Sequence, residues 1–407
     1  MQIPWTKVDR LDRIVSTEPL QTQRACPLCH TVVSEELFAL NNFQFFTDQG
    51  GLNRADHRVV NCKRCGLLYT NPCYTAEGFK ILFDKAGCSY GHTAGRIDEQ
   101  AEWVSCHFPL VESLMDVGCG NGNFLKALPK TLLRYGIDVD EKTLNKVAQG
   151  APGIRFDVCD FSGLKDLPLV DVITMFHVLE HLPEPDIFLA QLRKLSKNSV
   201  SLVIEVPIVD RAATLQDRDV VGFFTVQHLT HFSKATLKKL LAKSGWSVVR
   251  SEAMADYNGW RVVAEHGPIA EEIGRDTTGL IAARRYLNVW WGNVEAVKHR
   301  LKGLEMAPNI MVWGAGQHTE YLFSLTTLFD ADARFVVVDS DPLKQGLFYH
   351  SLPVLSPAQI PEKMWRNDDF QIVISTYGGQ DSLLEILLEK GVFDSRIVTL
   401  YDRTARY

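Results

Sequence analysis

Histidines beside a carboxylate are the first residues in this sequence whose types and spacing suit chemistry. The stretch FHVLEHL (176–182) contains His177, Glu180 and His181 in the pattern H-x-x-E-H. In zinc peptidases this pattern lies in the middle of a helix, where two imidazoles hold a metal ion and a carboxylate activates water. Here a strand-like segment, DVITM, precedes the motif and two prolines follow it, so a continuous helix cannot run through it. The sequence therefore disfavours a peptidase.

Paired cysteines are the second such feature. Cys26 and Cys29 form one C-x-x-C motif, and Cys62 and Cys65 form another after 32 intervening residues. Each motif aims two thiolates at one ion, and four thiolates complete the closed tetrahedral shell of a structural zinc site. Because no position is left for water, such a zinc ion stabilises a small module and does no chemistry. Paired buried thiols and a redox C-x-x-C are the alternatives, although a redox pair needs no second copy.

A glycine-rich turn, LMDVGCGNG, is the third feature. Gly118, Gly120 and Gly122 are needed where a backbone turns sharply after a strand and approaches a ligand without an intervening Cβ. Asp138 follows 16 residues after Gly122, at the expected end of the next strand, where a carboxylate accepts the hydroxyls of a ribose. The G-x-G-x-G spacing above Asp116 differs from the G-x-G-x-x-G of pyrophosphate-binding turns. It suits a nucleoside cofactor that carries cations, such as S-adenosylmethionine.

The loop TVQHLTHFS (225–233) supplies candidate bases. Ser233 is placed to cap the helix that begins at KATLKKLL, so His228 and His231 lie just ahead of that helix, at the edge of the site. A histidine there can act as a general base, because its unperturbed pKa of about 6.5 lets it take a proton near neutral pH. Local packing and hydrogen bonding is the alternative role for each.

These residues need a scaffold that brings strand ends together. From about residue 110, short apolar runs alternate with amphipathic stretches, which predicts a parallel, doubly wound α/β sheet. Strands are expected at residues 113–118, 132–140, 154–161, 171–178 and 201–207. Residues 256–307 are predicted to be mostly helical, and a second, smaller β-α alternation begins at NIMVWGAG.

Composition limits the class of partner. The chain has 407 residues, of which 46% are apolar and 23% charged, as expected of a globular protein with two or three domains. Its net charge of -6 gives no electrostatic footprint for nucleic acid or an anionic membrane, so we expect a small-molecule partner. We find neither a signal-peptide pattern nor an apolar run near the roughly 20 residues of a membrane span. The nine cysteines all lie within residues 26–159, which argues against a disulfide framework, and we expect a cytoplasmic protein.

Four segments in order, LMDVGCGNG, YGIDVD, VCDF and FHVLEHL, resemble the motifs of class I S-adenosylmethionine-dependent methyltransferases over roughly residues 110–250. The resemblance implies a central Rossmann-like domain that binds S-adenosylmethionine. It places the three glycines at the amino acid portion of the cofactor and Asp138 at the ribose. It also places Asp160 and Phe161 at the adenine, and Phe176 and His177 beside the methionine.

Over nearly the whole chain, the order of a cysteine-rich module, a methyltransferase domain and a C-terminal α/β domain resembles the zinc-containing nucleotide-sugar C-methyltransferases of deoxysugar biosynthesis. The segments IEVP (204–207), IMVWGAGQH (310–318) and VVVDSDPLKQG (336–346) are similar to that family. The resemblance implies that a histidine removes a proton beside a ketone and that the resulting enolate attacks the methyl group.

The histidine loop departs from the family pattern, which is roughly Y-H-E-H-L-S-Y-F-S. His228 matches the second histidine, the family's base, whereas Thr225 and Gln227 replace its tyrosine and glutamate. His231 stands at the later tyrosine, and Tyr90 is the nearest candidate for a catalytic tyrosine after the zinc module. These departures leave the substrate and the methylated atom open.

A second glycine turn lies near the C-terminus. Gly314 and Gly316 are followed by Asp339, which half-matches a dinucleotide fingerprint whose third glycine is replaced. A redox NAD site, a docking surface for the nucleotide part of a substrate, and a purely structural lobe all remain open. Lys344 can pair with a phosphate.

We therefore expect four regions: a zinc-binding module over residues 1–85, an S-adenosylmethionine-binding domain over 86–255, a helical connector over 256–300 and a smaller Rossmann-like, substrate-docking domain over 301–407. The leading hypothesis is methyl transfer to a small molecule, with C-methylation of a nucleotide-linked keto sugar by a histidine base. The alternatives are O- or N-methylation of another metabolite or carrier-bound intermediate, and a bifunctional or regulatory nucleotide-binding protein.

Overall fold

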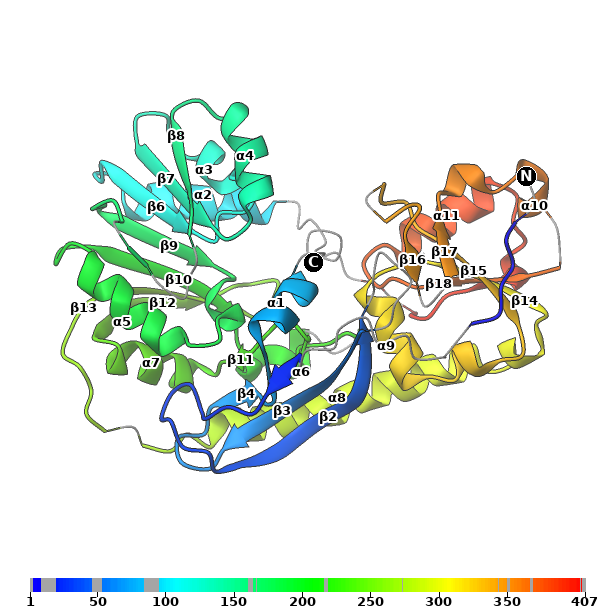
Figure 1. Cartoon of the computed structure of the whole chain (residues 1–407), viewed down its shortest axis with the longest axis horizontal. Coiled ribbons are helices and arrows are strands. Elements are labelled where there is room, and N and C mark those ends of the chain that lie inside the picture. The colour runs from blue at the N-terminus through cyan, green and yellow to red at the C-terminus, as the bar shows by residue number, and fades with distance from the viewer. Residues whose placement is uncertain are drawn as a thin grey trace.

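The structure is a computed structural model of the whole chain. It describes residues 3–8, 20–45, 53–83, 95–159, 164–165, 167–215, 219–272, 274–342, 344–349, 352–366, 369–402 and 404. The described residues form three larger sheets, one two-stranded sheet and the helices that pack against them (Figure 1).

A seven-stranded sheet forms the centre of the chain, in the order β12-β13-β10-β9-β6-β7-β8. Its strands are β6 (Ser113–Val117), β7 (Leu133–Asp138), β8 (Ile154–Val158), β9 (Val172–Phe176), β10 (Ser201–Pro207), β12 (Trp246–Ala253) and β13 (Gly259–His266). The first five are parallel to one another, whereas β13 is antiparallel to both β10 and β12. All five strands expected in this region are therefore confirmed, within a few residues at their ends.

Helices cover both faces of this sheet. Their bounds are α2 (Arg96–His107), α3 (Asn123–Ala127), α4 (Glu141–Gln149), α5 (Pro185–Leu195) and α7 (Lys234–Lys243). The apolar side chains of α2, α3 and α4 share one core cluster with one face of the sheet, and those of α5 and α7 share another with the opposite face. Because alternate residues of a strand point to opposite faces, both faces must be apolar, and β6 is buried along its whole length.

One part of the sequence behaves differently from our prediction. Residues 256–300 were expected to form a helical connector, but Gly259–His266 form β13, which lies between β10 and β12 in the sheet. The helix α8 covers only Thr278–Leu301. The segment GWRVVAEH contains a buried arginine, and that charge breaks the continuous apolar run that marks an interior strand.

The N-terminal part contains a four-stranded sheet in the order β11-β4-β3-β2. Its strands are β2 (Ser34–Phe45), β3 (Asn53–Cys62), β4 (Leu68–Thr70) and β11 (Thr230–His231). The strand β11 comes from the histidine loop, so residues far apart in the sequence complete one sheet. A short pair, β1 (Gln21–Thr22) with β5 (Cys73–Tyr74), and helix α1 (Ala76–Phe83) lie beside it.

The C-terminal part contains a six-stranded sheet in the order β16-β17-β15-β14-β18-β19. Its elements are β14 (Asn309–Trp313), α9 (Gln317–Leu325), β15 (Arg334–Val338), β16 (Phe348–Tyr349), β17 (Leu352–Leu355), α10 (Glu362–Trp365), β18 (Gln371–Ile374), α11 (Gln380–Glu389) and β19 (Ile397–Val398). This is the second β-α alternation predicted from the sequence. The long helix α8 runs along the base of the molecule toward this sheet (Figure 1).

The hydrophobic core does not divide at residue 301. One cluster of buried side chains includes Phe38 and Phe43 of the N-terminal sheet, Trp290 of α8, and Ile310 and Val337 of the C-terminal sheet. Phe38 packs edge-on against Trp290, with ring centroids 5.2 Å apart. The C-terminal sheet is therefore attached through apolar contacts to the parts that carry the cysteines and the histidine loop.

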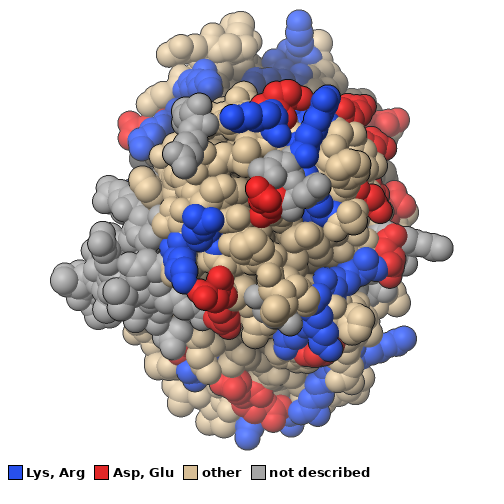
Figure 2. Space-filling model, turned by 90° about the vertical axis from the view of Figure 1, so that its right-hand side faces the viewer, with Lys and Arg blue, Asp and Glu red and all other residues tan. Residues whose placement is uncertain are grey.

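On the face drawn in Figure 2, basic and acidic side chains are interspersed. No helix in the described segments combines the length and the apolar character that a membrane span needs.

The loop that carries His228 is fixed to α8 by two hydrogen bonds. Tyr286 accepts one from the backbone N–H of Phe223 at 2.6 Å, and Trp290 donates one to the carbonyl of Val220 at 2.9 Å. All four residues are buried.

Replacing Tyr286 by Phe tests this attachment. The variant leaves the buried N–H of Phe223 without its acceptor, so we expect the free energy of unfolding to fall by about 1–3 kcal/mol. Urea denaturation measures this loss. Trp291→Phe, at a partly exposed position of the same helix, is the control and should change stability by less than about 0.5 kcal/mol. Equal stability of the two variants would contradict the assignment.

Candidate functional site

The glycine turn lies after β6, at the carboxyl edge of the central sheet. Gly118, Gly120 and Gly122 have φ of 72°, 50° and 68°, in the left-handed region that favours glycine. A Cβ on Gly118 would lie 2.4 Å from Val178, and one on Gly122 would lie 2.9 Å from Phe156. A Cβ on Gly120 would meet nothing within 4 Å. Packing therefore requires the outer two glycines, and the middle one borders open space that a ligand can enter.

Asp138 ends β7 beside this turn. Its carboxylate accepts hydrogen bonds from the N–H of Gly120 at 2.8 Å and from the N–H of Asp140 at 3.0 Å. The side chain is only half-buried. Each carboxylate oxygen keeps a further lone pair, so both can still accept the hydroxyls of a ribose.

Asp116 plays a different part. It is buried beneath the turn and accepts a hydrogen bond from the Thr174 hydroxyl at 2.7 Å. Burial raises the pKa of Asp116 to about 7, and the Thr174 hydrogen bond opposes that change only in part. Asp116 therefore supports the turn from inside the protein.

His177 lies directly after β9 and forms the centre of a charged cluster. Its Nε2 is 3.1 Å from Glu205, and its Nδ1 is 3.4 Å from Glu180. Burial alone would lower the pKa of His177, but Glu180 and Glu205 outweigh burial and raise the pKa to about 9. Phe176, one residue earlier, packs against Phe124 with ring centroids 5.0 Å apart. His177 is therefore a cation at neutral pH, at the strand end where a cofactor was expected.

Glu205 connects this cluster to the neighbouring strand β13. It is fully buried and accepts hydrogen bonds from Arg261 at 2.7 Å and from the Tyr257 hydroxyl. Arg261 stands directly opposite Glu205 in the pairing of β10 with β13, and it also contacts Glu99 at 2.6 Å. Because the charges are paired, the buried acid and base satisfy each other.

The histidine loop separates its two histidines. His228 is half-buried, and its ring centroid lies 4.9 Å from that of His181. His231 is 1% exposed and packs edge-on against Phe224, and neither of its ring nitrogens has a hydrogen-bond partner in the described part of the chain. Burial lowers the pKa of both His228 and His231 well below 6.5, so both are neutral near pH 7. Of the two predicted bases, only His228 borders accessible space.

Three predicted site residues are not covered. Tyr90, Asp160 and Phe161 lie outside the described residues. Their proposed roles in catalysis and adenine binding therefore stay predictions.

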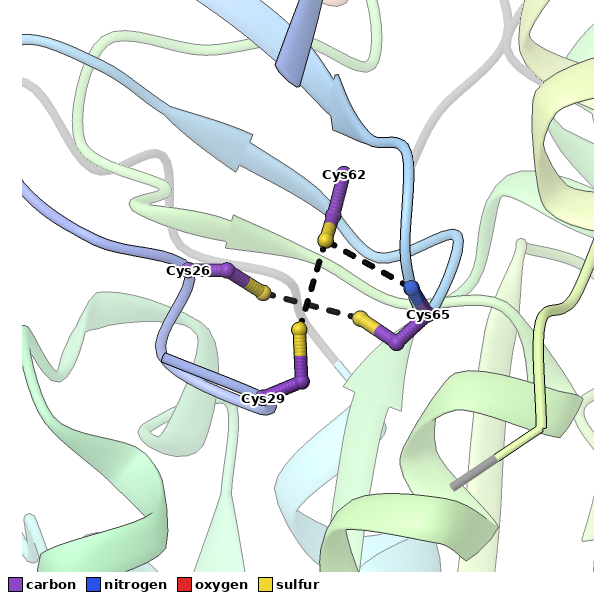
Figure 3. Close-up of side chains that lie close together, drawn as sticks. All are labelled: Cys26, Cys29, Cys62 and Cys65. Carbon is purple, nitrogen blue, oxygen red and sulfur yellow. Dashed lines mark hydrogen bonds between the residues drawn. The ribbon is translucent and has the colours of Figure 1, made fainter. Parts of the chain in front are cut away.

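The four predicted cysteines form one cluster (Figure 3). The sulfur atoms of Cys26 and Cys65 are 3.6 Å apart, and those of Cys29 and Cys62 are 3.4 Å apart. In a tetrahedral zinc site, Zn–S bonds of about 2.3 Å separate the sulfurs by roughly 3.8 Å. Small shifts of the sulfur atoms would therefore let the cluster bind a divalent cation with tetrahedral coordination. The apolar side chains around the cluster belong to the core of the central sheet.

The second glycine turn repeats the geometry of the first. Asp339, after β15, accepts hydrogen bonds from the N–H of Ala315 at 2.7 Å and from the N–H of Asp341 at 2.8 Å. In addition, Lys344 donates to Asp339 at 3.4 Å, and a Cβ on Gly316 would lie 3.4 Å from its ammonium nitrogen. The second turn thus has an ammonium group close to both its glycine and its carboxylate.

A direct contact joins the second turn to the histidines. The side chain of Gln317, which begins α9, donates to the side chain of Gln227 at 2.8 Å. The carbonyl of Gln227 in turn accepts from His181 Nδ1 at 2.9 Å. The two features lie next to each other although some 90 residues separate them in the sequence.

A family model described as a methyltransferase domain matches residues 94–251. These residues form a class I S-adenosylmethionine-dependent methyltransferase domain. A comparison with curated proteins gives no match.

Solved structures similar to this methyltransferase domain share little sequence with it. An S-adenosylmethionine-dependent methyltransferase from Clostridium acetobutylicum has 13% identity, covers 47% of this chain and 98% of its own, and gives a TM-score of 0.36. The 1,6-didemethyltoxoflavin-N1-methyltransferase from Burkholderia thailandensis has 16% identity, covers 51% of this chain and 98% of its own, and gives a TM-score of 0.39. The magnesium protoporphyrin IX methyltransferase from Synechocystis has 20% identity, covers 47% of this chain and 95% of its own, and gives a TM-score of 0.35.

The charged cluster of the methyltransferase domain was not predicted from the sequence. Glu205 and Arg261 each carry a signal, because each is a charge inside an otherwise apolar strand. Their opposition across β10 and β13 becomes visible only once the sheet order is known. Glu180 was noticed only as part of H-x-x-E-H, which here runs from a strand end into a 3-10 turn, Leu179–His181.

The charge of His177 predicts a pH dependence of stability. His177 holds its proton up to about pH 9 in the folded protein but only up to about 6.5 in the unfolded chain. Its stabilising contribution is therefore complete below pH 6.5 and is lost as the pH rises through about 9, with a maximum of about 3 kcal/mol. The free energy of unfolding of the protein minus that of His177→Gln should decrease across this range in urea titrations. A difference that does not vary with pH would contradict the paired, protonated His177.

Proposed function

We propose that this protein transfers a methyl group from S-adenosylmethionine to a small, nucleotide-linked sugar that binds between the methyltransferase domain and the second glycine turn. The observation that carries this proposal is the contact of Gln317 with Gln227, because it puts a nucleotide-type turn beside the histidine cluster. An acceptor with a phosphate at one end and a reacting carbon or oxygen at the other fits such a pair of sites.

The cofactor side rests on the first turn. Gly120 leaves room for the amino acid portion, and Asp138 offers two acceptors for the ribose hydroxyls. When bound, S-adenosylmethionine supplies an electrophilic methyl group on a sulfonium. His177 stands at the end of the neighbouring strand β9, where its cation can pair with the carboxylate of the methionine.

The acceptor side rests on the second turn. Lys344 holds an ammonium group above Gly316, at the position where a nucleotide-binding turn meets phosphate. Because Lys344 also engages Asp339, one oxygen of that carboxylate is less available for a ribose. That pairing favours docking of a phosphate over a redox dinucleotide.

His228 is our proposed base. Methyl transfer is an in-line displacement, so a weak nucleophile must be aligned and must lose its proton. A neutral imidazole accepts that proton, from the carbon beside a ketone or from a hydroxyl, and burial keeps His228 neutral. We assign His231 a packing role, because it is buried among Phe223 and Phe224.

We also propose that Cys26, Cys29, Cys62 and Cys65 bind a structural zinc ion. Four thiolates leave no position for substrate, and the cluster lies in the core shared by the N-terminal part and the methyltransferase domain. The ion would hold these two parts together and take no part in methyl transfer.

Asp138→Ala tests the cofactor site. The substitution removes both ribose acceptors, so we expect affinity for S-adenosylmethionine to fall at least about tenfold, or roughly 1.4 kcal/mol, by isothermal titration calorimetry. Asp157→Ala, at an exposed ion pair on β8, is the matched control and should bind like the native protein. Unchanged affinity in Asp138→Ala, or no binding by the native protein, would reject the proposed cofactor site.

His228→Ala tests the base. We expect it to keep affinity for S-adenosylmethionine but to lose about 10²–10⁴-fold in turnover, measured by mass spectrometry of products from nucleotide-linked keto and hydroxy sugars. His266→Ala, at a surface histidine bonded to Ser196, controls for loss of an imidazole. Turnover restricted to ketones would indicate carbon as the nucleophile, and turnover on hydroxyl acceptors alone would favour O-methylation. Native-like turnover by His228→Ala would assign the base elsewhere.

A further inference from the structure

Three side chains beside the methyltransferase domain converge although their sequence positions differ. One donor atom each from Glu180, His181 and His228 lies within 4.8 Å of the other two. Glu180 and His181 belong to the 3-10 turn after β9, and His228 comes from the loop before β11. Two imidazoles and one carboxylate are a common ligand set for divalent transition metals.

The environment of Glu180 indicates that this cluster binds a ligand. Its side chain is fully buried, yet neither carboxylate oxygen accepts a hydrogen bond from the described residues. Among the described residues, His177 is a charged neighbour, with its Nδ1 3.4 Å from Oε1. Buried carboxylate oxygens normally have hydrogen-bond or metal partners, because an unpartnered buried charge is strongly destabilising. A partner is therefore expected for the Glu180 carboxylate, one oxygen of which belongs to this cluster.

His181 is oriented as a metal ligand. Its Nδ1 donates to the carbonyl of Gln227 at 2.9 Å, so Nε2 carries the lone pair. A hydrogen bond from the second ring nitrogen to a carbonyl is the arrangement that fixes the tautomer of most metal-binding histidines.

The spacing of the two rings also fits. With metal–nitrogen bonds of about 2.1 Å, two imidazoles on one ion have ring centroids roughly 4.5–5 Å apart. The centroids of His181 and His228 are 4.9 Å apart.

We propose that Glu180, His181 and His228 form a second metal site, which binds a divalent transition metal such as Zn²⁺, Mn²⁺, Fe²⁺ or Co²⁺. Because both histidines are partly exposed and Glu180 is not, the remaining coordination positions face accessible space. An oxygen of the methyl acceptor is the chemical group that we assign to those positions, and this part rests on the proposed function.

An ion at this site would change the role of His228. Its lone pair would be committed to coordination, and the ion would lower the pKa of a bound acceptor hydroxyl or enol, so that its proton passes to solvent. Loss of turnover in His228→Ala fits both roles, so metal binding must be measured directly.

Metal counting on the full chain tests the site. The protein is stripped with a chelator, reloaded with excess CoCl₂, desalted and analysed by mass spectrometry and visible absorption. We expect two ions per chain, one with the thiolate-to-cobalt charge-transfer bands of the cysteine cluster and one without. Glu180→Gln, His181→Ala and His228→Ala should each retain only the ion with thiolate bands, and His266→Ala should retain both.

Two results would overturn the site: a native chain that binds only the thiolate-ligated ion, or variants that all retain two ions. Glu180→Gln is nearly isosteric, so its circular dichroism and its affinity for S-adenosylmethionine distinguish a lost ion from a lost fold. Failure of the native protein to bind S-adenosylmethionine would reject the proposed function but leave the ion count, and hence this inference, intact. Loss of the second ion with unchanged cofactor affinity supports the site.

Discussion

The guanidinium group of Arg24 fixes the arrangement on which the candidate site depends. It donates to the carbonyls of Thr70 at 3.0 Å, Pro183 at 2.7 Å and Leu229 at 2.6 Å. These carbonyls belong to the N-terminal sheet, to the turn after His181 and to the loop after His228. A guanidinium has donors in a rigid fork, so it can hold three chain segments in one geometry. The convergence of the histidines therefore depends on a residue of the cysteine-bearing part.

The three larger sheets are also connected to one another through shared core packing. The cysteine cluster is in one core with the central sheet, while Phe38 and Trp290 connect the N-terminal sheet to the C-terminal one. A carbonyl of Cys65 accepts from the N–H of Asp276, and Lys243 donates to the carbonyl of Leu28. Packing of this kind transmits a displacement from one part to the next, because a close-packed interior has no free volume to absorb it. The domain boundaries predicted from the sequence describe composition better than they describe the core.

Local signals were enough to predict much of the structure. Glycine at Gly118, Gly120 and Gly122 after an apolar strand, and an acid at the next strand end, specify a tight strand-to-helix turn with a carboxylate beside it through short-range geometry. The spacing of Cys26 and Cys29, repeated at Cys62 and Cys65, likewise makes a four-sulfur cluster predictable. Each of these features depends on residues that are close in sequence or on a motif that occurs twice.

Features that depend on distant partners were not predictable. His228 and His231 look equivalent in the sequence, yet the pairing of β11 with β4 buries the second and leaves the first half-exposed. Strand β13 was not predicted because it contains the charged residue Arg261. The charge is compensated by Glu205 on the neighbouring strand, and a single sequence does not show which charged residues lie opposite each other. The proximity of Glu180 to His228 was unpredictable for the same reason, because the sequence near each residue does not show that their two loops lie together.

The glycine turn separates two constraints that a sequence pattern merges. The outer glycines are enforced by the protein's own side chains, Val178 and Phe156, and would be needed even in a chain that had lost every ligand. Gly120 alone is free of such contacts, so its left-handed backbone and a bound molecule, and not packing within the protein, disfavour a side chain there. In a related protein that no longer bound a cofactor, packing would still require glycine at Gly118 and Gly122, and Gly120 would be the first of the three to be substituted.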